Sequence, residues 1–344
     1  MNRRIAVVVI LALVAAALLG GFAAYKHRLG GEGASAREIV VCSAGSLGLP
    51  LKSLAQSYER ETGVKVLLKL SGSVDIVRQV SQLGLRCDVV AVADYRLIPL
   101  FLYPNLTSWY IVFAGNEMVI AWRGHGGSLA EALKAIESGR ASYGTSDPNR
   151  DPCGYRAVGA LALYSLYYND TRLLESLIAS IPGARYEVRG GILHIYIPAS
   201  FTPRGGLVVR PKSVELLSLL ESGEIDYAIL YKSEAVEHNL TYAPLPPRAN
   251  LGDPGLADAY GRVVVHILAG TPQEKAIAMA PIAYGLTVPS NARDPGDAVE
   301  FVRYVLTHGR EVFESHGFIF YTHPRGYGRL PGQLGGLAVE EGSP

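Results

Sequence analysis

The sequence predicts an α/β protein with two lobes. From residue 38 onward, short apolar segments alternate with segments whose apolar residues recur at helical spacing. One apolar segment, residues 88–93, is apolar almost throughout, which is typical of a strand buried on both faces of a parallel sheet. The chain has 344 residues, of which 49% are hydrophobic, so it can bury two cores of ordinary size.

Residues 1–36 come before this pattern and predict a membrane anchor or signal segment followed by a tether. Residues 5–24 are an uncharged apolar run with Arg3 and Arg4 directly before it. The run is long enough for a spanning helix, and basic residues tend to stay in the cytoplasm. We therefore expect the protein at the extracytoplasmic face of the cell membrane, anchored by or exported through residues 5–24.

The first lobe opens with strands and helices in alternation. Apolar runs predict strands at residues 38–42, 64–70 and 88–93, and amphipathic spacing predicts helices at residues 49–62 and 74–83. The order βαβαβ predicts parallel strands joined by right-handed crossovers. A return strand at 284–288 and a helix at 297–307 are expected to complete this lobe, which would comprise residues 37–112 and 287–324.

The second lobe is expected to comprise residues 113–286. An extended stretch, 109–122, leads into it. Its expected elements are helices at 128–138, from Asp151 to 168 and at 211–221, strands at 141–144 and 227–231, and an irregular region at 185–206. Residues 325–344 are rich in glycine and proline and predict a disordered tail.

The net charge argues against a nucleic-acid binder, and the cysteines allow a disulfide. The formal net charge is +1, whereas a nucleic-acid binder usually has a basic surface and a high pI. Cys42 and Cys87 lie near the starts of two predicted strands, so an exported protein could join them by a disulfide. The alternative is that these two residues and Cys153 are three buried, small hydrophobic side chains.

Three polar residues occupy the same position relative to a strand and a helix. Ser46 and Ser73 each follow a predicted strand and precede a helix, and Asp151 is expected to be the N-cap of a helix that begins at Pro152. Helix N-termini attract anions, and ligands of open α/β sheets bind beyond the carboxyl ends of the strands. Each residue could also be only a cap or turn residue, but the three together favour an oxyanion receptor.

Asp151 bears on the identity of the anion. A carboxylate repels an oxyanion unless a positive centre lies between them, and the metal of a tetrahedral oxometallate provides such a centre. Sulfur and phosphorus do not expand their coordination in this way, so Asp151 favours tungstate or molybdate over sulfate. Tyr231, at the end of the strand predicted at 227–231, could donate its phenol hydrogen to the ligand, although it could equally be a half-buried core tyrosine.

Several motifs, in order and with fitting spacing, resemble those of the archaeal tungstate/molybdate-binding proteins of ABC transporters. They are Ala44-Gly45-Ser46-Leu47, Ser71-Gly72-Ser73, residues 88–95, Asp151-Pro152-Cys153-Gly154-Tyr155-Arg156 and residues 223–233. The resemblance covers residues 38 to 320. It implies a two-lobed periplasmic-binding-protein-like (type II) fold with mixed, mostly parallel sheets and a hinge. It also implies delivery of the anion to a membrane permease coupled to a cytoplasmic ATPase.

The resemblance further implies a set of site residues. It places Gly45, Ser46 and Ser73 on the oxyanion from the first lobe, and Asp151, Pro152, Cys153 and Tyr231 from the second, with Asp151 on the metal. The family pattern has a second metal-coordinating residue, a glutamate, where this chain has Ser213. Glu215 is the nearest substitute, but two residues along a helix is about 200°, so its side chain is expected to point elsewhere. This departure puts six-fold coordination of the metal in doubt.

Other functions find less support in the sequence. Ala44-Gly45-Ser46-Leu47-Gly48 approximates a hydrolase nucleophile elbow, but it follows the first strand and no histidine has an evident partner role. The histidines show no metal-ligand spacing, so a receptor for metal cations is disfavoured. A receptor for sulfate, phosphate or another tetrahedral anion remains the closest alternative. We therefore expect a monomeric binding protein that is not an enzyme, needs no cofactor and binds no nucleic acid.

Overall fold

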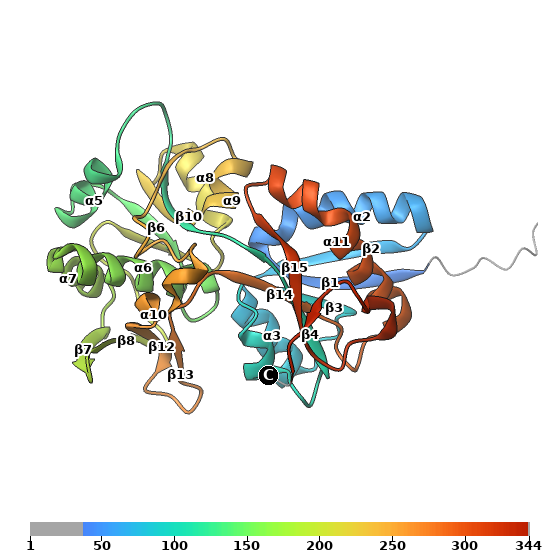
Figure 1. Cartoon of the computed structure of the whole chain (residues 1–344). Helices are drawn as coiled ribbons and strands as arrows, with labels where there is room; N and C mark the ends of the chain where they lie inside the picture. Colours follow the sequence, from blue (N-terminus) through green and yellow to red (C-terminus); the bar gives the residue numbers. More distant parts are fainter. Residues whose placement is uncertain (1–36, 343–344) are drawn as a thin grey trace, which may run out of the picture.

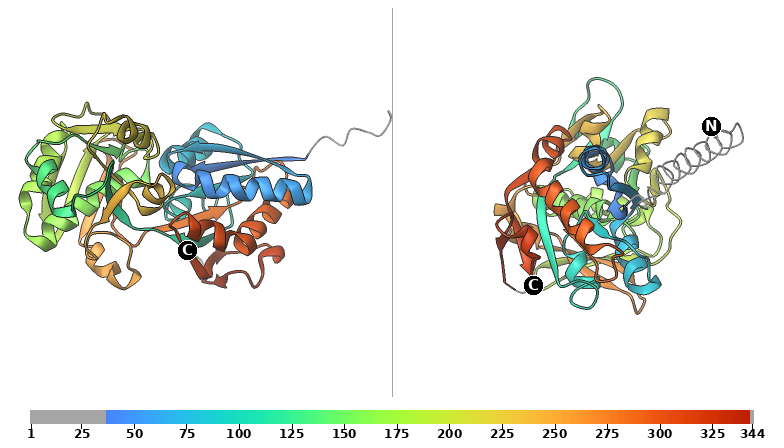
Figure 2. Two further views of the ribbon diagram at one scale, coloured as in Figure 1. Left: turned by 90° about the horizontal axis from the view of Figure 1, so that it is seen from above. Right: turned by 90° about the vertical axis from the view of Figure 1, so that its right-hand side faces the viewer.

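The computed structural model describes residues 37–342, which form two lobes side by side (Figures 1 and 2). Lobe 1 is built on a seven-stranded sheet of strand order β16-β15-β4-β14-β3-β1-β2. Its strands are β1 (Glu38–Ala44), β2 (Lys65–Ser71), β3 (Val89–Val92), β4 (Trp109–Gly115), β14 (Ala283–Thr287), β15 (Ile319–Gly328) and β16 (Val339–Glu340). Its helices are η1 (Gly45–Leu47), α2 (Gly48–Thr62), α3 (Ser73–Leu83), α4 (Leu97–Phe101), α11 (Pro295–Ser315) and η3 (Gly332–Leu334).

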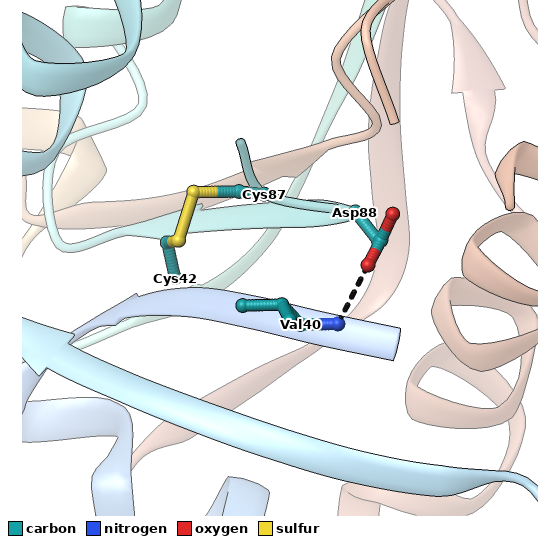
Figure 3. The surroundings of a disulfide bond; sticks show 4 residues. All are labelled: Val40, Cys42, Cys87 and Asp88. Atoms are coloured by element: carbon teal, nitrogen blue, oxygen red, sulfur yellow. Dashed lines mark hydrogen bonds between the residues drawn. A yellow bond between two sulfur atoms is a disulfide. The ribbon is translucent and has the colours of Figure 1, made fainter. Parts of the chain in front are cut away.

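The opening strands of lobe 1 follow the predicted βαβαβ order. Strand β1 pairs in parallel with both β2 and β3. Cys42 on β1 and Cys87, just before β3, form a disulfide, and Asp88 next to it accepts a hydrogen bond from the Val40 amide at 2.7 Å (Figure 3). Helix α11 packs against α2, where the Tyr58 ring contacts the rings of Phe301 and Tyr304. These contacts tie the two ends of the described chain to one core.

Lobe 2 contains two sheets, with the buried helix α6 packed against strands of both. One sheet has the order β11-β5-β10-β6-β9, with β5 (Met118–Trp122), β6 (Tyr143–Ser146), β9 (Leu207–Arg210), β10 (Tyr227–Tyr231) and β11 (Thr241–Pro244). The other has the order β13-β12-β8-β7, with β7 (Arg185–Arg189), β8 (Ile192–Pro198), β12 (Val263–Ala269) and β13 (Lys275–Ala278). The helices are α5 (Leu129–Glu137), α6 (Pro152–Tyr168), α7 (Thr171–Ser180), α8 (Glu215–Ser222), α9 (Lys232–Glu237), η2 (Pro254–Leu256) and α10 (Ala257–Tyr260).

Helix α6 begins as the sequence predicts, with Asp151 as N-cap and Pro152 at the first helical position. Most of its side chains are buried, because sheets and α7 surround it. Gly154 allows the close approach of its first turn to β6, since a Cβ there would lie 2.3 Å from the Ser146 carbonyl oxygen. The start of α6 is therefore fixed against the end of a strand.

The second sheet of lobe 2 contradicts the expectation of an irregular region at 185–206. Strands β7 and β8 form an antiparallel hairpin there, turning at Gly190 and Gly191, which both have positive φ. Two glycines between apolar runs are a hairpin signal. Strand β8 then pairs with β12, about 70 residues further along the chain, and this pairing completes the sheet.

All three sheets are mixed, but the expectation of mostly parallel strands was wrong, since seven strand pairs of the described chain are antiparallel and six are parallel. The strands next to the lobe boundary account for much of this: β14 pairs antiparallel with β3 and β4, and β5 pairs antiparallel with β10 and β11. The chain crosses between the lobes after β4, at residues 116–117, and before β14, at residues 279–282. These crossings lie a few residues from the expected boundaries at 113 and 286.

The expected disordered tail was also wrong for residues 325–342. Strand β15 continues to Gly328 and pairs with β4, and β16 pairs with β15. The Tyr327 ring stacks on Tyr110 at a centroid separation of 4.8 Å, which gives this glycine-rich segment an aromatic anchor. The expected anchor at residues 5–24 lies outside the described residues, and no helix within 37–342 is apolar and long enough to cross a membrane.

Candidate functional site

The two lobes touch where helix N-termini from both face one another, a region we call the junction. From lobe 1 it contains Gly45, Ser46 and residues 72–75. From lobe 2 it contains residues 150–153, Ser213, Val214, Tyr231 and Glu234. The amides of Val74 and Asp75 donate to the Arg150 carbonyl oxygen at 3.1 and 3.3 Å, and a Cβ on Gly72 would lie 2.3 Å from that oxygen. The lobes are therefore closed on each other at this point.

Lobe 1 brings neutral groups to the junction. A Cβ on Gly45 would lie 3.1 Å from the Val214 side chain of lobe 2. Ser46 and Ser73 are both buried. The Ser73 Oγ accepts a hydrogen bond from the Ala93 amide at 3.0 Å, so its own hydrogen is left to donate. Gly45 thus lies at the contact with lobe 2, and Ser73 lies between Gly72 and Val74, which both contact Arg150 of lobe 2.

Asp151 is buried at the junction and does not cap its helix. Its residue is the N-cap of α6, but its side chain forms no capping hydrogen bond, and its Oδ2 accepts from the Ser213 amide at 3.1 Å. Burial raises the pKa of Asp151 to about 6. The carboxylate is thus held by a residue of another segment and leaves the first turn of α6 uncapped.

Pro152 and Cys153 form the first turn of α6 behind Asp151. Proline lacks an amide hydrogen and suits this position, where the hydrogen would have no partner in the helix. Cys153 is a free, buried thiol whose Sγ lies 3.7 Å from the Ile229 carbonyl oxygen. Burial raises the pKa of this thiol well above its usual value, so it stays protonated.

Tyr231 ends strand β10 and is fully buried. Its phenol oxygen accepts a hydrogen bond from Arg156 Nη1 at 2.9 Å, which leaves the phenol hydrogen free to donate. Burial raises the pKa of Tyr231, and the charge of Arg156 offsets part of that rise, so the phenol is neutral at physiological pH.

The structure distinguishes Ser213 from Glu215. Ser213 is buried at the junction, where its amide donates a hydrogen bond to Asp151 and its hydroxyl is hydrogen-bonded to Glu234. Glu215 is 35% exposed and forms an ion pair with Lys212 at 3.1 Å. The Glu215 carboxylate is therefore paired with Lys212, whereas Ser213 contacts Asp151 directly.

Arg156 is a junction neighbour to which the sequence reasoning assigned no role, although it ends a quoted motif. It is 1% exposed, and its Nη1 donates to the Ala93 carbonyl oxygen of lobe 1 at 2.6 Å as well as to Tyr231. Its Nη2 lies 3.4 Å from Asp94 Oδ2, and its Nε and Nη2 have no hydrogen-bond partner within residues 37–342. A buried guanidinium with unused donors gives this region a positive charge that favours an anion.

Asp94 of lobe 1 balances this charge. It accepts hydrogen bonds from Tyr155 Oη at 2.8 Å and from Arg96 Nη2 at 2.6 Å. Burial raises the pKa of Asp94, but the charges of Arg96 and Arg156 outweigh burial and hold the pKa well below its usual range. Because Tyr155 and Arg156 belong to lobe 2, this buried carboxylate helps to hold the closed arrangement.

The sequence reasoning also assigned no functional role to Tyr284 and Glu234. Tyr284 follows the second crossing between the lobes and accepts from Asn116 Nδ2, next to the first crossing, at 3.1 Å. Burial raises the pKa of Tyr284 well above its usual value, an effect that hydrogen bonds with Ser46 and Asn116 partly offset. Glu234 lies three residues after Tyr231. A glutamate at this spacing can fold back and accept a hydrogen bond from the backbone at the start of a helix, and this spacing is the one signal for Glu234 in the sequence.

Residues 37–342 contain no cluster of acidic, histidine or cysteine side chains suited to a metal ion.

Comparisons with known proteins agree with this architecture. A family model described as a bacterial extracellular solute-binding protein matches residues 39–319. An uncharacterized solute-binding protein of Staphylothermus marinus is 42% identical over 335 residues, which cover 94% of each chain. The molybdate/tungstate-binding protein WtpA of Pyrococcus abyssi is 38% identical over 326 residues, covering 90% of this chain and 92% of the relative.

Two solved structures share the fold at low sequence identity. The periplasmic molybdate-binding protein of Azotobacter vinelandii superposes with a TM-score of 0.56 at 14% identity, over 83% of this chain and 100% of the other. The sulfate-binding protein SubI of Mycobacterium tuberculosis H37Rv gives 0.52 at 12% identity, over 82% and 86%. These likenesses confirm the predicted two-lobed, periplasmic-binding-protein-like (type II) α/β fold. The family serves transport and not catalysis, as the sequence predicts, and the chain belongs to the bacterial extracellular solute-binding proteins.

Proposed function

We propose that this protein captures tungstate or molybdate between its lobes and delivers the oxyanion to the permease of an ABC transporter. The observation that carries the proposal is Asp151, a buried carboxylate at the junction whose side chain does not cap its own helix. Such a carboxylate disfavours an ordinary oxyanion, whereas it can bind the metal centre of an oxometallate. Relatives named molybdate/tungstate-binding proteins, at 37–38% identity, support the same cargo.

The proposed binding groups come from both lobes. Gly45, Ser46 and Ser73 would hold oxygens of the anion from lobe 1. Asp151, Pro152, Cys153 and Tyr231 would close on it from lobe 2, with Asp151 on the metal and Ser213 beside it. The free hydroxyl hydrogens of Ser73 and Tyr231 support these roles, because an oxyanion offers only acceptors.

The proposed partners follow from the transport role. The permease would receive the anion and would be driven by a cytoplasmic ATPase, since this chain has no phosphate-binding loop motif of its own. Residues 5–24 would anchor the protein to the cell membrane or direct its export. The lobes would then operate outside the cytoplasm, as a monomer.

Titration calorimetry of the full chain with tungstate, molybdate, sulfate and phosphate tests the proposal. We expect one anion per chain, with tungstate or molybdate bound at least a thousandfold more tightly than sulfate, about 4 kcal/mol. The alternative is a receptor for another tetrahedral oxyanion, because the neutral donors would serve sulfate or phosphate equally well. Equal or tighter binding of sulfate or phosphate would establish that alternative and overturn the proposed cargo.

A further inference from the structure

Glu234 is a fully buried carboxyl group that the proposed site does not use. It lies in the first turn of α9, where its Oε2 accepts a hydrogen bond from the Tyr231 amide at 3.2 Å. Its Oε1 is hydrogen-bonded to the Ser213 hydroxyl. Glu234 therefore contacts both Tyr231, a proposed ligand residue, and Ser213, the neighbour of Asp151.

Two buried carboxyl groups share one serine at this place. The Ser213 amide donates to Asp151, while its hydroxyl pairs with Glu234. The cations on neighbouring segments pair elsewhere: Arg156 with Asp94, Lys212 with Glu215 and Lys232 with Glu117. The ionisable groups that act on Glu234 or share its immediate surroundings are Asp151, Cys153, Arg156, Tyr231, Glu237 and Tyr284.

An anion receptor cannot easily keep both carboxyls charged. Two buried negative charges repel each other and repel the dianion that the junction is proposed to bind. Asp151 must be ionised to bind a metal centre. Glu234 is then the group that can carry a proton without loss of that contact.

We propose that Glu234 is the neutral acid in the oxyanion-binding form of the protein and acts as a positioning residue through Ser213. This inference rests on the proposed function. A neutral Glu234 can donate its proton to Ser213 Oγ, which turns the serine hydrogen toward the anion. An ionised Glu234 instead takes that hydrogen for itself and adds a second buried negative charge.

The titration of Glu234 agrees with this assignment. Burial raises the pKa of Glu234 to about 8, and the nearby charge of Asp151 adds to the rise, so Glu234 is neutral near pH 7. Oxyanion affinity should therefore be full near pH 7 and fall as pH rises through 8, by at most about tenfold per pH unit for one proton.

Calorimetry of the full chain with sodium tungstate from pH 6.5 to 9.5 tests the inference. We expect the affinity of the natural protein to fall about thirtyfold between pH 7 and pH 9.5. Glu234→Gln keeps an acceptor for the Tyr231 amide and donates to Ser213 as the neutral acid would. This variant should bind tungstate at pH 9.5 nearly as well as at pH 7.

Glu237→Gln is the matched control, because it removes another buried glutamate of α9, whose pKa burial raises to about 9. Glu237 lies 3.1 Å from His316, which directly follows α11, and forms no hydrogen bond with the proposed ligand residues. Its variant should keep the pH dependence of the natural protein. A flat profile for Glu237→Gln, together with an unchanged one for Glu234→Gln, would assign the proton to Glu237 and overturn the inference.

A measurement on the natural protein covers the case in which Glu234→Gln does not fold. Calorimetry at pH 8.5 in two buffers of different ionisation enthalpy reports the protons taken up on binding. Net uptake of a fraction of a proton is expected, and zero uptake with a flat affinity profile would overturn the inference. Tungstate and molybdate binding that is weak at every pH would instead contradict the proposed function, so the two failures are distinguishable.

Discussion

Lobe 1 and lobe 2 bring different chemistry to the junction. Lobe 1 supplies the backbone at Gly45 and the neutral hydroxyls of Ser46 and Ser73, which can bind the oxygens of any tetrahedral anion. Lobe 2 supplies Asp151 and Glu234, whose carboxyl groups change charge with pH, and Ser213, which is hydrogen-bonded to both. We propose that lobe 1 recognises only the oxygens, whereas lobe 2, besides donating to an oxygen through Tyr231, also recognises the central atom and the charge.

The lobes also differ in their cysteines, because only lobe 1 of the described chain has a disulfide. Lobe 1 has a disulfide between β1 and the start of β3, whereas Cys153 of lobe 2 is a free thiol. The disulfide lies beside the Asp88 contact with β1 (Figure 3). The ligand contacts proposed for lobe 1 lie beyond the ends of β1 and β2. The covalent tie therefore belongs to the scaffold of lobe 1.

The largest expected effect is on the stability of lobe 1. Removing the disulfide with Cys42→Ala/Cys87→Ala frees a loop of 45 residues, which should cost about 4 kcal/mol. Denaturant unfolding of the natural and double-variant proteins measures this loss. Tungstate affinity, measured well below the unfolding transition, should stay within about threefold. A large loss of affinity in a folded double variant would mean that the scaffold and the site of lobe 1 are not separate.

The next effect tests the claim that lobe 2 recognises the central atom. Asp151→Asn removes the carboxylate but keeps an acceptor for the Ser213 amide. We expect tungstate affinity to fall about a hundredfold, while sulfate affinity falls little or rises. Calorimetry with both anions at pH 7 measures the difference.

Asp147→Asn provides the control for Asp151→Asn. Asp147 lies in the same loop and accepts a hydrogen bond from the Asn149 amide at 2.9 Å, but it is not among the proposed ligand residues. Its variant should leave the ratio of tungstate to sulfate affinity unchanged. Equal losses for both anions in Asp151→Asn would reduce Asp151 to a residue that only holds the Ser213 segment in place.

The parts of this molecule that could be predicted from the sequence are those set by local patterns. Short apolar runs predict the βαβαβ order of lobe 1, and Asp151 and Pro152 predict the start of α6. Both predictions succeed because hydrophobic periodicity and helix caps depend on residues close together in the sequence. The hairpin of β7 and β8 had a local signal in Gly190 and Gly191 that was overlooked. Its pairing with β12 had none, because strand partners far apart in the chain are chosen by the tertiary fold.

The ligand candidates of the proposed site came from sequence motifs, whereas the groups that contact them could not be predicted. Ser213 was recognised as a departure from the family pattern, and Glu215, which opens α8 two residues later, is ion-paired with Lys212. That Ser213 meets Glu234, 21 residues away, depends on how the segment before α8 lies against the first turn of α9, which no local pattern encodes. The same applies to Arg156, whose partners Ala93 and Asp94 lie in the other lobe.

The smallest expected effect tests the claim that lobe 1 does not distinguish between anions. Ser46→Ala removes one neutral hydroxyl at the start of η1, and one lost hydrogen bond should lower affinity about fivefold, about 1 kcal/mol. The loss should be equal for tungstate and sulfate, since a hydroxyl donates to an oxygen of either anion. Ser53→Ala, on the exposed side of α2, removes a hydroxyl that bonds only its own helix and should change neither affinity. A loss confined to tungstate in Ser46→Ala would mean that lobe 1 also senses the central atom, and the division of roles between the lobes would fail.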